Sequence, residues 1–138
     1  ILFTKYKDTV DYLENNLRGK DFDTFIMHGD MSLNTRTEIF GKFDRAKKAI
    51  LIATDVISEG LNLQRLASNV VHYELPWNPN RLEQRNGRVD RIGQRSETVN
   101  IRTLVVDKSL DKEILLLLMD KKKTMESDRD YAAASLVM

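Results

Sequence analysis

The sequence has 138 residues, of which 41% are hydrophobic and 31% charged, a balance typical of one globular domain with a sizeable core. Its 22 basic and 21 acidic residues leave a net charge of +1, so overall charge gives no case for nucleic-acid binding. Any nucleic-acid-binding surface must therefore come from the local placement of basic residues. The lack of cysteine excludes disulfides and thiolate metal sites, and the wide separation of His28 and His72 predicts no metal site.

No stretch approaches the roughly 20 apolar residues of a membrane span, and we expect no membrane contact. No signal peptide is visible, because the chain begins directly with an apolar run, ILFTKY. That abrupt beginning predicts a segment of a longer protein.

Short apolar runs recur along the chain and predict strands. They cover residues 1–3, 24–27, 49–53, 69–73 and 99–106. Between these runs lie helical patterns, in which apolar residues repeat at intervals of three and four. The pattern residues are Val10, Leu13 and Leu17 before Gly19, then Ile39, Phe40 and Phe43 after an N-cap at Ser32, and finally Leu110, Ile114, Leu117 and Leu118 after Ser109. This alternation predicts an α/β fold with an open, mostly parallel sheet and helices on both faces.

The stretch 80–94, NRLEQRNGRVDRIGQ, predicts a helix that begins near Pro79 and ends at Gly93. On a helical wheel Gln84, Arg88 and Arg91 share one side, with Gly87 beside them. Leu82, Val89 and Ile92 gather on another side, which we expect to face the core. Two arginines one turn apart could clamp a polyphosphate, because each guanidinium offers paired donors. Spacing alone equally allows a solvated basic face.

The loop 53–64, ATDVISEGLNLQ, follows a buried strand and carries a hydroxyl, two carboxylates and a glycine. Such a loop can present backbone N–H groups to a phosphate. The alternative is an ordinary strand-to-helix turn in which Gly60 adopts a positive dihedral angle.

The pattern Gln84-x-x-Gly87-Arg88-x-x-Arg91-x-Gly93-Gln94 resembles motif VI of superfamily 2 helicases, in the form found in Swi/Snf-type DNA translocases and their bacterial relatives. The loop 53–64 resembles motif V of the same family. The resemblance implies a RecA-like, three-layered second lobe over residues 1–122, with a tail at 123–138 that is frayed or docks as a separate helix and leads out of the domain. The forms GRVDRIGQ and ATDVISEGLNLQ are closest to prokaryotic members.

The resemblance also assigns residues to roles. It implies that Arg88 and Arg91 are catalytic arginine fingers. Contacts to the nucleotide are implied for Glu59, Gly60, Asn62, Gln84, Arg88 and Arg91, although Glu59 departs from the family pattern and suggests an inter-lobe or coupling contact. Contacts to nucleic acid are implied for Thr4, Lys5, His28, Gly29, Thr54 and Trp77.

Several of these residues have simpler explanations. Lys5 and Lys7 could be solvated charges in a turn, and His28 could be a structural hydrogen-bonding residue. Trp77 could be buried against the sheet as readily as stacked on a sugar or base. Arg36 is predicted to brace the loop at His28 rather than to bind a ligand.

The sequence contains no G-x-x-x-x-G-K-[ST] loop and no acidic DExx box, the parts that hold ATP and Mg²⁺. We therefore expect both to be held mainly by an N-terminal RecA-like lobe of the same polypeptide, and this chain alone to be inactive. The resemblance implies the C-terminal motor lobe of an ATP-dependent translocase (a helicase-type hydrolase) on double-stranded DNA, cytoplasmic and nucleoid-associated in a prokaryote. Alternatives are a lobe of an RNA helicase or restriction-type motor, or a non-catalytic nucleic-acid-binding or scaffold module.

Overall fold

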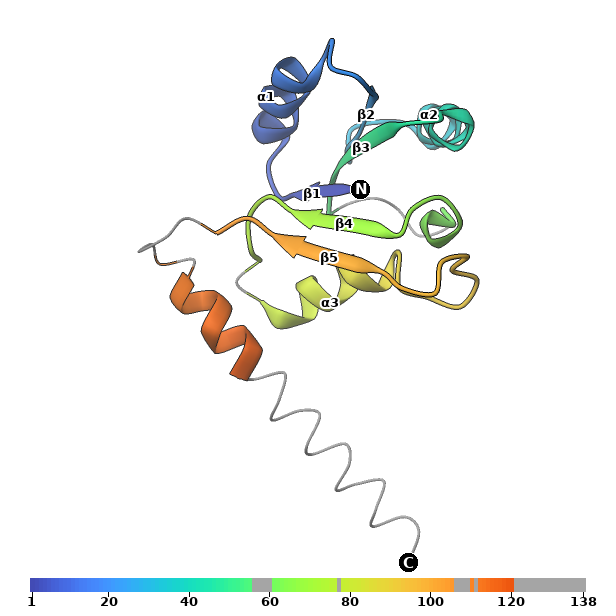
Figure 1. Ribbon diagram of the computed structural model, residues 1–138. Coiled ribbons are helices and arrows are strands. Elements are labelled where there is room, and N and C mark those ends of the chain that lie inside the picture. The colour runs from blue at the N-terminus through green and yellow to red at the C-terminus, as the bar shows by residue number, and fades with distance from the viewer. Residues whose placement is uncertain (56–60, 77, 106–109, 111, 121–138) are drawn as a thin grey trace, which may run out of the picture.

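The computed structural model describes residues 1–55, 61–76, 78–105, 110 and 112–120 (Figure 1). Its centre is a five-stranded sheet with the strand order β2-β3-β1-β4-β5, in which every neighbouring pair is parallel. The strands are β1 (Leu2–Thr4), β2 (Asp23–Met27), β3 (Ala49–Thr54), β4 (Asn69–His72) and β5 (Asn100–Thr103). The α/β prediction with a parallel sheet is confirmed, and each predicted strand forms within a few residues of its expected bounds.

Helices cover both faces of the sheet (Figure 1). They are α1 (Lys7–Leu17), α2 (Leu33–Arg45) and α3 (Pro79–Gly87), with a short 3-10 helix, η1, at Leu63–Arg65. On one face Val10 and Leu13 of α1 pack with Ile52 of β3. On the other face Phe43 of α2 packs with Leu51 of β3, because alternate residues of a strand point to opposite sides. The result is the three-layered arrangement of a RecA-like fold.

The last described helix, residues 112–120, agrees only in part with its predicted pattern. Ile114 and Leu118 are buried and pack with Leu75, as expected for an apolar side. Leu110 and Leu117, placed on the same side by the sequence pattern, are instead exposed. The predicted N-cap Ser109 and the tail 123–138 lie outside the described residues.

Helix α3 ends at Gly87, six residues before the predicted end. The chain then turns so that Val89 is fully buried, whereas Ile92 is 97% exposed. The Gln94 side-chain amide donates to the carbonyls of Val89 and Ala67, which stabilises this turn. The prediction was right for Val89 and wrong for Ile92.

Gly93 nevertheless has a positive backbone dihedral angle, with φ of 98°. That backbone conformation is strained for any residue with a Cβ atom. Gly93 therefore ends the turn after α3 rather than the helix itself.

Ser32 is the N-cap of α2, as predicted. Its side-chain oxygen accepts a hydrogen bond from the backbone N–H of Thr35 at 3.1 Å. The cap satisfies one of the backbone donors that a helix leaves unpaired at its first turn.

We expect the substitution Ser32→Ala to lower the free energy of unfolding by about 1 kcal/mol, because the Thr35 N–H loses its acceptor. Ser32→Asp is the matched control and should stay close to the parent, since its carboxylate accepts the same bond. Urea unfolding of the three proteins measures the difference. Equal stability of the alanine and aspartate variants would contradict the assignment.

Candidate nucleotide and nucleic-acid site

A hollow of about 980 Å³ lies beside the end of α3. Its lining includes Asn62 from the loop before η1, Gln84 from α3, and Arg88 and Arg91 from the turn after α3. These are the predicted nucleotide contacts that fall within the described residues. Although the helix does not continue as predicted, the turn keeps both arginines on the same side as Gln84.

The guanidinium groups of Arg88 and Arg91 form no hydrogen bond or ion pair with any other described residue. Arg88 is partly exposed and Arg91 is exposed. The neighbouring Gly87 faces open space, since a Cβ atom there would meet nothing within 4 Å. The positive charges are therefore available to an anionic group entering the hollow.

The start of α3 follows from its sequence. Asn78 caps the helix by accepting a hydrogen bond from the backbone N–H of Asn80 at 2.9 Å, and Pro79 occupies the first helical position. Proline is suited to that position because its missing N–H would have no intrahelical partner.

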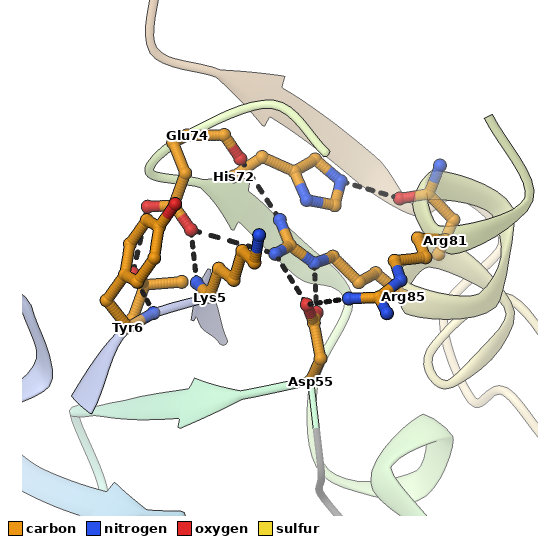
Figure 2. Close-up of polar contacts among 9 residues, drawn as sticks. Lys5, Tyr6, Asp55, His72, Glu74, Arg81 and Arg85 are labelled. Atoms are coloured by element: carbon orange, nitrogen blue, oxygen red, sulfur yellow. Dashed lines mark hydrogen bonds and ion pairs between the residues drawn. The ribbon is translucent and has the colours of Figure 1, made fainter. Parts of the chain in front are cut away.

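Arg85 of α3 fastens this helix to the sheet (Figure 2). Its side chain is only 3% exposed and forms a two-pronged ion pair with Asp55, with Nη2 to Oδ2 at 3.1 Å. Its Nη1 donates to the backbone carbonyl of Glu74 at 3.0 Å, and its Nη2 lies 3.7 Å from the Glu74 carboxylate. One guanidinium thus joins α3 to the residues that follow β3 and β4.

Glu74 extends the same cluster to β1. Its carboxylate accepts hydrogen bonds from the Thr4 hydroxyl, at 2.8 Å, and from the backbone N–H of Lys5. Because β1, β3 and β4 are neighbours in the sheet, the cluster of Arg85, Asp55 and Glu74 ties three strand ends together.

A second polar pair lies under α3. His72 Nε2 donates to Asn86 Oδ1 at 2.8 Å, and His72 Nδ1 is buried without a partner. Burial lowers the pKa of His72 from its ordinary value of 6.5, and the nearby charge of Arg85 lowers it further, while the Asn86 hydrogen bond and Asp55 act in the opposite direction. His72 is therefore uncharged at neutral pH.

The predicted nucleic-acid contacts lie at the carboxyl edge of the sheet. Thr4 and Thr54 are paired in register on adjacent strands, and both are buried. The Thr4 hydroxyl is held by Glu74, whereas the Thr54 hydroxyl has no hydrogen-bond partner. The exposed Lys5 places its ammonium 5.3 Å from the ring centre of Tyr6.

His28 and Gly29 follow β2 at the same edge. The Arg36 guanidinium donates to the Gly29 carbonyl at 2.7 Å and is buried, so the predicted brace at this loop is confirmed. His28 Nδ1 is buried and lacks a hydrogen-bond partner. Glu59, Gly60 and Trp77 lie outside the described residues, and their roles stay predictions.

Sequence reasoning missed Arg85, Glu74 and His72. A signal for Arg85 was present, since it lies three residues after Leu82 and four before Val89, on the side expected to face the core. An arginine in such a position indicates a buried ion pair. Its partner Asp55 is 30 residues away and could not be identified from spacing.

Among the described residues no group of three or more histidines or carboxylates could hold a metal ion. No described helix is long and apolar enough to cross a membrane.

A protein-family profile, the helicase conserved C-terminal domain, matches residues 1–93. The chain belongs to this family. It is 36% identical over 121 residues to the uncharacterized ATP-dependent helicase YqhH of Bacillus subtilis, covering 88% of this chain and 21% of that protein. It is 33% identical over 128 residues to the ATP-dependent RNA helicase FAL1 of Candida glabrata, covering 93% of this chain and 32% of that protein.

Among solved structures, the C-terminal part of the Fun30 ATPase domain matches with a TM-score of 0.76 and 29% identity. The match covers 85% of this chain and 38% of the Fun30 chain. The chain therefore shares its fold with this part of the Fun30 ATPase domain. It spans about a fifth to a third of the length of the two curated relatives.

We expect Arg85→Met to lower the free energy of unfolding by about 3 kcal/mol, because Asp55 loses its buried partner. Arg81→Met is the control, since Arg81 is largely exposed and its Nη1 lies 3.9 Å from Asp55 Oδ2. An exposed pair of that kind contributes at most about 1 kcal/mol. Urea unfolding compares the two, and equal losses would contradict a buried structural tie.

Stability should fall as the pH drops below about 6.5, because the unfolded chain then protonates His72 while the folded chain keeps it neutral. For one proton the slope reaches at most about 1.4 kcal/mol per pH unit. Urea midpoints at pH values above and below 6.5 should show a smaller acid loss in His72→Gln than in the parent. His28→Gln, which alters the other histidine, should keep the His72 contribution. Parallel pH profiles of the parent and His72→Gln would refute this origin.

Proposed function

We propose that the chain is the C-terminal motor lobe of an ATP-dependent translocase on double-stranded DNA, of the Swi/Snf type and from a prokaryote. The observation that carries this proposal is the hollow beside α3, where Arg88 and Arg91 lie unpaired with Asn62 and Gln84. Similarity to an ATP-dependent helicase and to an ATPase domain supports the use of ATP. Residues 1–122 form the lobe, and 123–138 lead out of it.

The geometry suits arginine fingers. An N-terminal RecA-like lobe of the same polypeptide holds ATP and Mg²⁺ against this hollow. Arg88 and Arg91 then neutralise the charge that grows on the transferred phosphoryl group, which a planar guanidinium does without changing its own protonation. Gln84 and Asn62, together with Gly60 and Glu59, contact the nucleotide or the opposite lobe.

The carboxyl edge of the sheet suits the tracked strand. Thr54, Thr4 and Lys5 come from adjacent strand ends, and His28 with Gly29 follows β2 at the same edge. Contacts of this kind are made to phosphates and carry little sequence information. Closure on ATP and opening after hydrolysis would move this edge, with Trp77, along the nucleic acid in the cytoplasm.

A lobe of an RNA helicase is the second candidate, favoured by the similarity to FAL1 over most of this chain. Gln84 supports the DNA translocase, since DEAD-box RNA helicases carry histidine at the corresponding place in the motif. A non-catalytic scaffold of the same fold would have no use for two unpaired arginines beside a nucleotide site.

In the intact protein, Arg88→Ala and Arg91→Ala should each lower the nucleic-acid-stimulated ATPase rate by about 10³-fold or more. ATP binding should change far less, since the other lobe holds the nucleotide. Arg18→Ala is the control, because Arg18 is an exposed arginine paired with Glu14 at 2.6 Å. The ATP turnover rate and a nucleotide titration measure the two effects. A turnover rate close to that of the parent in the Arg91→Ala protein would contradict the proposal.

The same intact protein decides between the two motor types. Double-stranded DNA should stimulate ATP hydrolysis more than single-stranded DNA or RNA of equal length. Stimulation by RNA alone would assign the lobe to an RNA helicase. Absence of ATP hydrolysis both with and without nucleic acid would favour the non-catalytic scaffold.

A further inference from the structure

Basic side chains gather at the amino edge of the sheet, opposite the edge that carries Thr4 and Thr54. Every described connection that leads into β2, β3, β4 or β5 contributes at least one of them. We name this set the amino-edge basic surface: Lys20, Arg45, Lys47, Lys48, Arg65 and Arg95. All six residues are exposed.

These residues line connected hollows. One of about 560 Å³ is lined by Lys20, Arg45, Lys47 and Lys48. The next, of about 340 Å³, shares Lys47 with the first and adds Arg65 and Arg95. Arg65 also lines the larger hollow of Arg88 and Arg91, so that site and the amino-edge hollows adjoin one another.

The amino-edge cations are largely unpaired, whereas several exposed basic residues elsewhere in the described chain are held by carboxylates. Lys7, Arg18 and Lys42 each form an ion pair of 2.7 Å or less with a carboxylate. At the amino edge only Lys48 does so, with Asp21 at 2.6 Å. The other five have no side-chain hydrogen bond or ion pair with a described residue.

Acidic residues do not cancel this charge. Asp21, Asp23 and Asp44 line the two hollows, against six basic side chains. Clustered like charges repel one another and destabilise the folded state slightly, so a surface that keeps them unpaired suits an anionic ligand. The net charge of +1 for the whole sequence conceals this local excess.

The lining indicates which anion fits. Among the residues that the structure describes, no exposed large hydrophobic side chain lines either hollow, so these linings offer no apolar group for insertion into a lipid surface. Two aromatic residues, Phe22 and Phe43, line the two hollows, but they are partly or fully buried. The described lining therefore offers no exposed ring for base stacking. Exposed lysines and arginines in a continuous hollow instead match a chain of phosphates.

We propose that the amino-edge basic surface is a second nucleic-acid site, which binds the phosphodiester backbone of a duplex without reading its sequence. It goes beyond the proposed motor function, whose nucleic-acid contacts lie at the carboxyl edge. A protein that uses both edges holds two segments of nucleic acid at once.

The test uses the intact protein without ATP and a labelled mixed-sequence duplex of about 40 base pairs, as DNA and as RNA, titrated between about 50 and 200 mM salt. The variant is Lys47→Glu with Arg95→Glu. The slope of log affinity against log salt is negative, and each lost phosphate contact reduces its magnitude by about 0.9. The slope of the double variant should therefore be shallower than that of the parent by about 1.8. A loss on both duplexes assigns a general phosphate site, and a loss on one assigns that nucleic acid.

The control is Arg102→Glu with Lys112→Glu, which makes the same change of charge on β5 and on the last helix. Its slope should match the parent. A parental slope in the Lys47 and Arg95 variant, or an equal loss in the control, would overturn the proposal. The proposal would also be overturned if poly-glutamate binding depended on Lys47 and Arg95 while duplex binding did not.

The motor proposal and the amino-edge proposal are tested by different measurements. The finger variants report on ATP turnover, whereas the amino-edge variant reports on binding without nucleotide. Turnover in the absence of nucleic acid should be unchanged by Lys47→Glu with Arg95→Glu, since neither residue lines the hollow of Arg88 and Arg91.

Discussion

The buried guanidinium of Arg85 is the interaction on which the geometry of the candidate site depends. Removing a charge from water is costly, and Arg85 is tolerated at 3% exposure because Asp55 and the Glu74 carbonyl engage its donors. Those partners follow β3 and β4, and the Glu74 carboxylate also holds the start of the chain segment after β1. The position of α3 over the sheet is therefore fixed by directional polar contacts, and with it the positions of Gln84 and of the turn that carries Arg88 and Arg91.

The layered α/β fold could be predicted because it depends on local patterns that the sequence states directly. Buried strands such as β3 appear as unbroken apolar runs, and Ser32 marks the start of α2 by a capping rule that needs no tertiary information. The end of α3 could not be predicted in the same way. The helical periodicity of the sequence continues to Gly93. The turn after Gly87, however, depends on a hydrogen bond from the Gln94 side chain to the carbonyl of Ala67, a residue from a separate part of the chain.

In the candidate site, too, local groupings could be predicted and contacts between separate parts of the chain could not. Gln84, Arg88 and Arg91 were grouped from one stretch of sequence, and Asn62 joins them in the structure across a hollow that spacing alone could not reveal. The helical wheel placed Ile92 in the core, and the same early turn that exposes it leaves the arginines on the open side. The grouping of the arginines holds for a reason other than the one that predicted it, namely the turn fixed by Val89 and Gln94.

The two edges of the sheet use charge in opposite ways. At the carboxyl edge Asp55, Glu74 and Arg85 satisfy one another, so their charges define shape and offer little to a ligand. Around the turn after α3 and at the amino edge, cations such as Arg91 and Arg95 stay unpaired. A net charge near zero is thus compatible with local attraction for phosphates, because carboxylates such as Asp55 and Glu74 pair with Arg85 in the framework and do not neutralise the exposed cations. In a protein of this kind, the residues that bind anions are found by asking which cations the fold leaves without a partner.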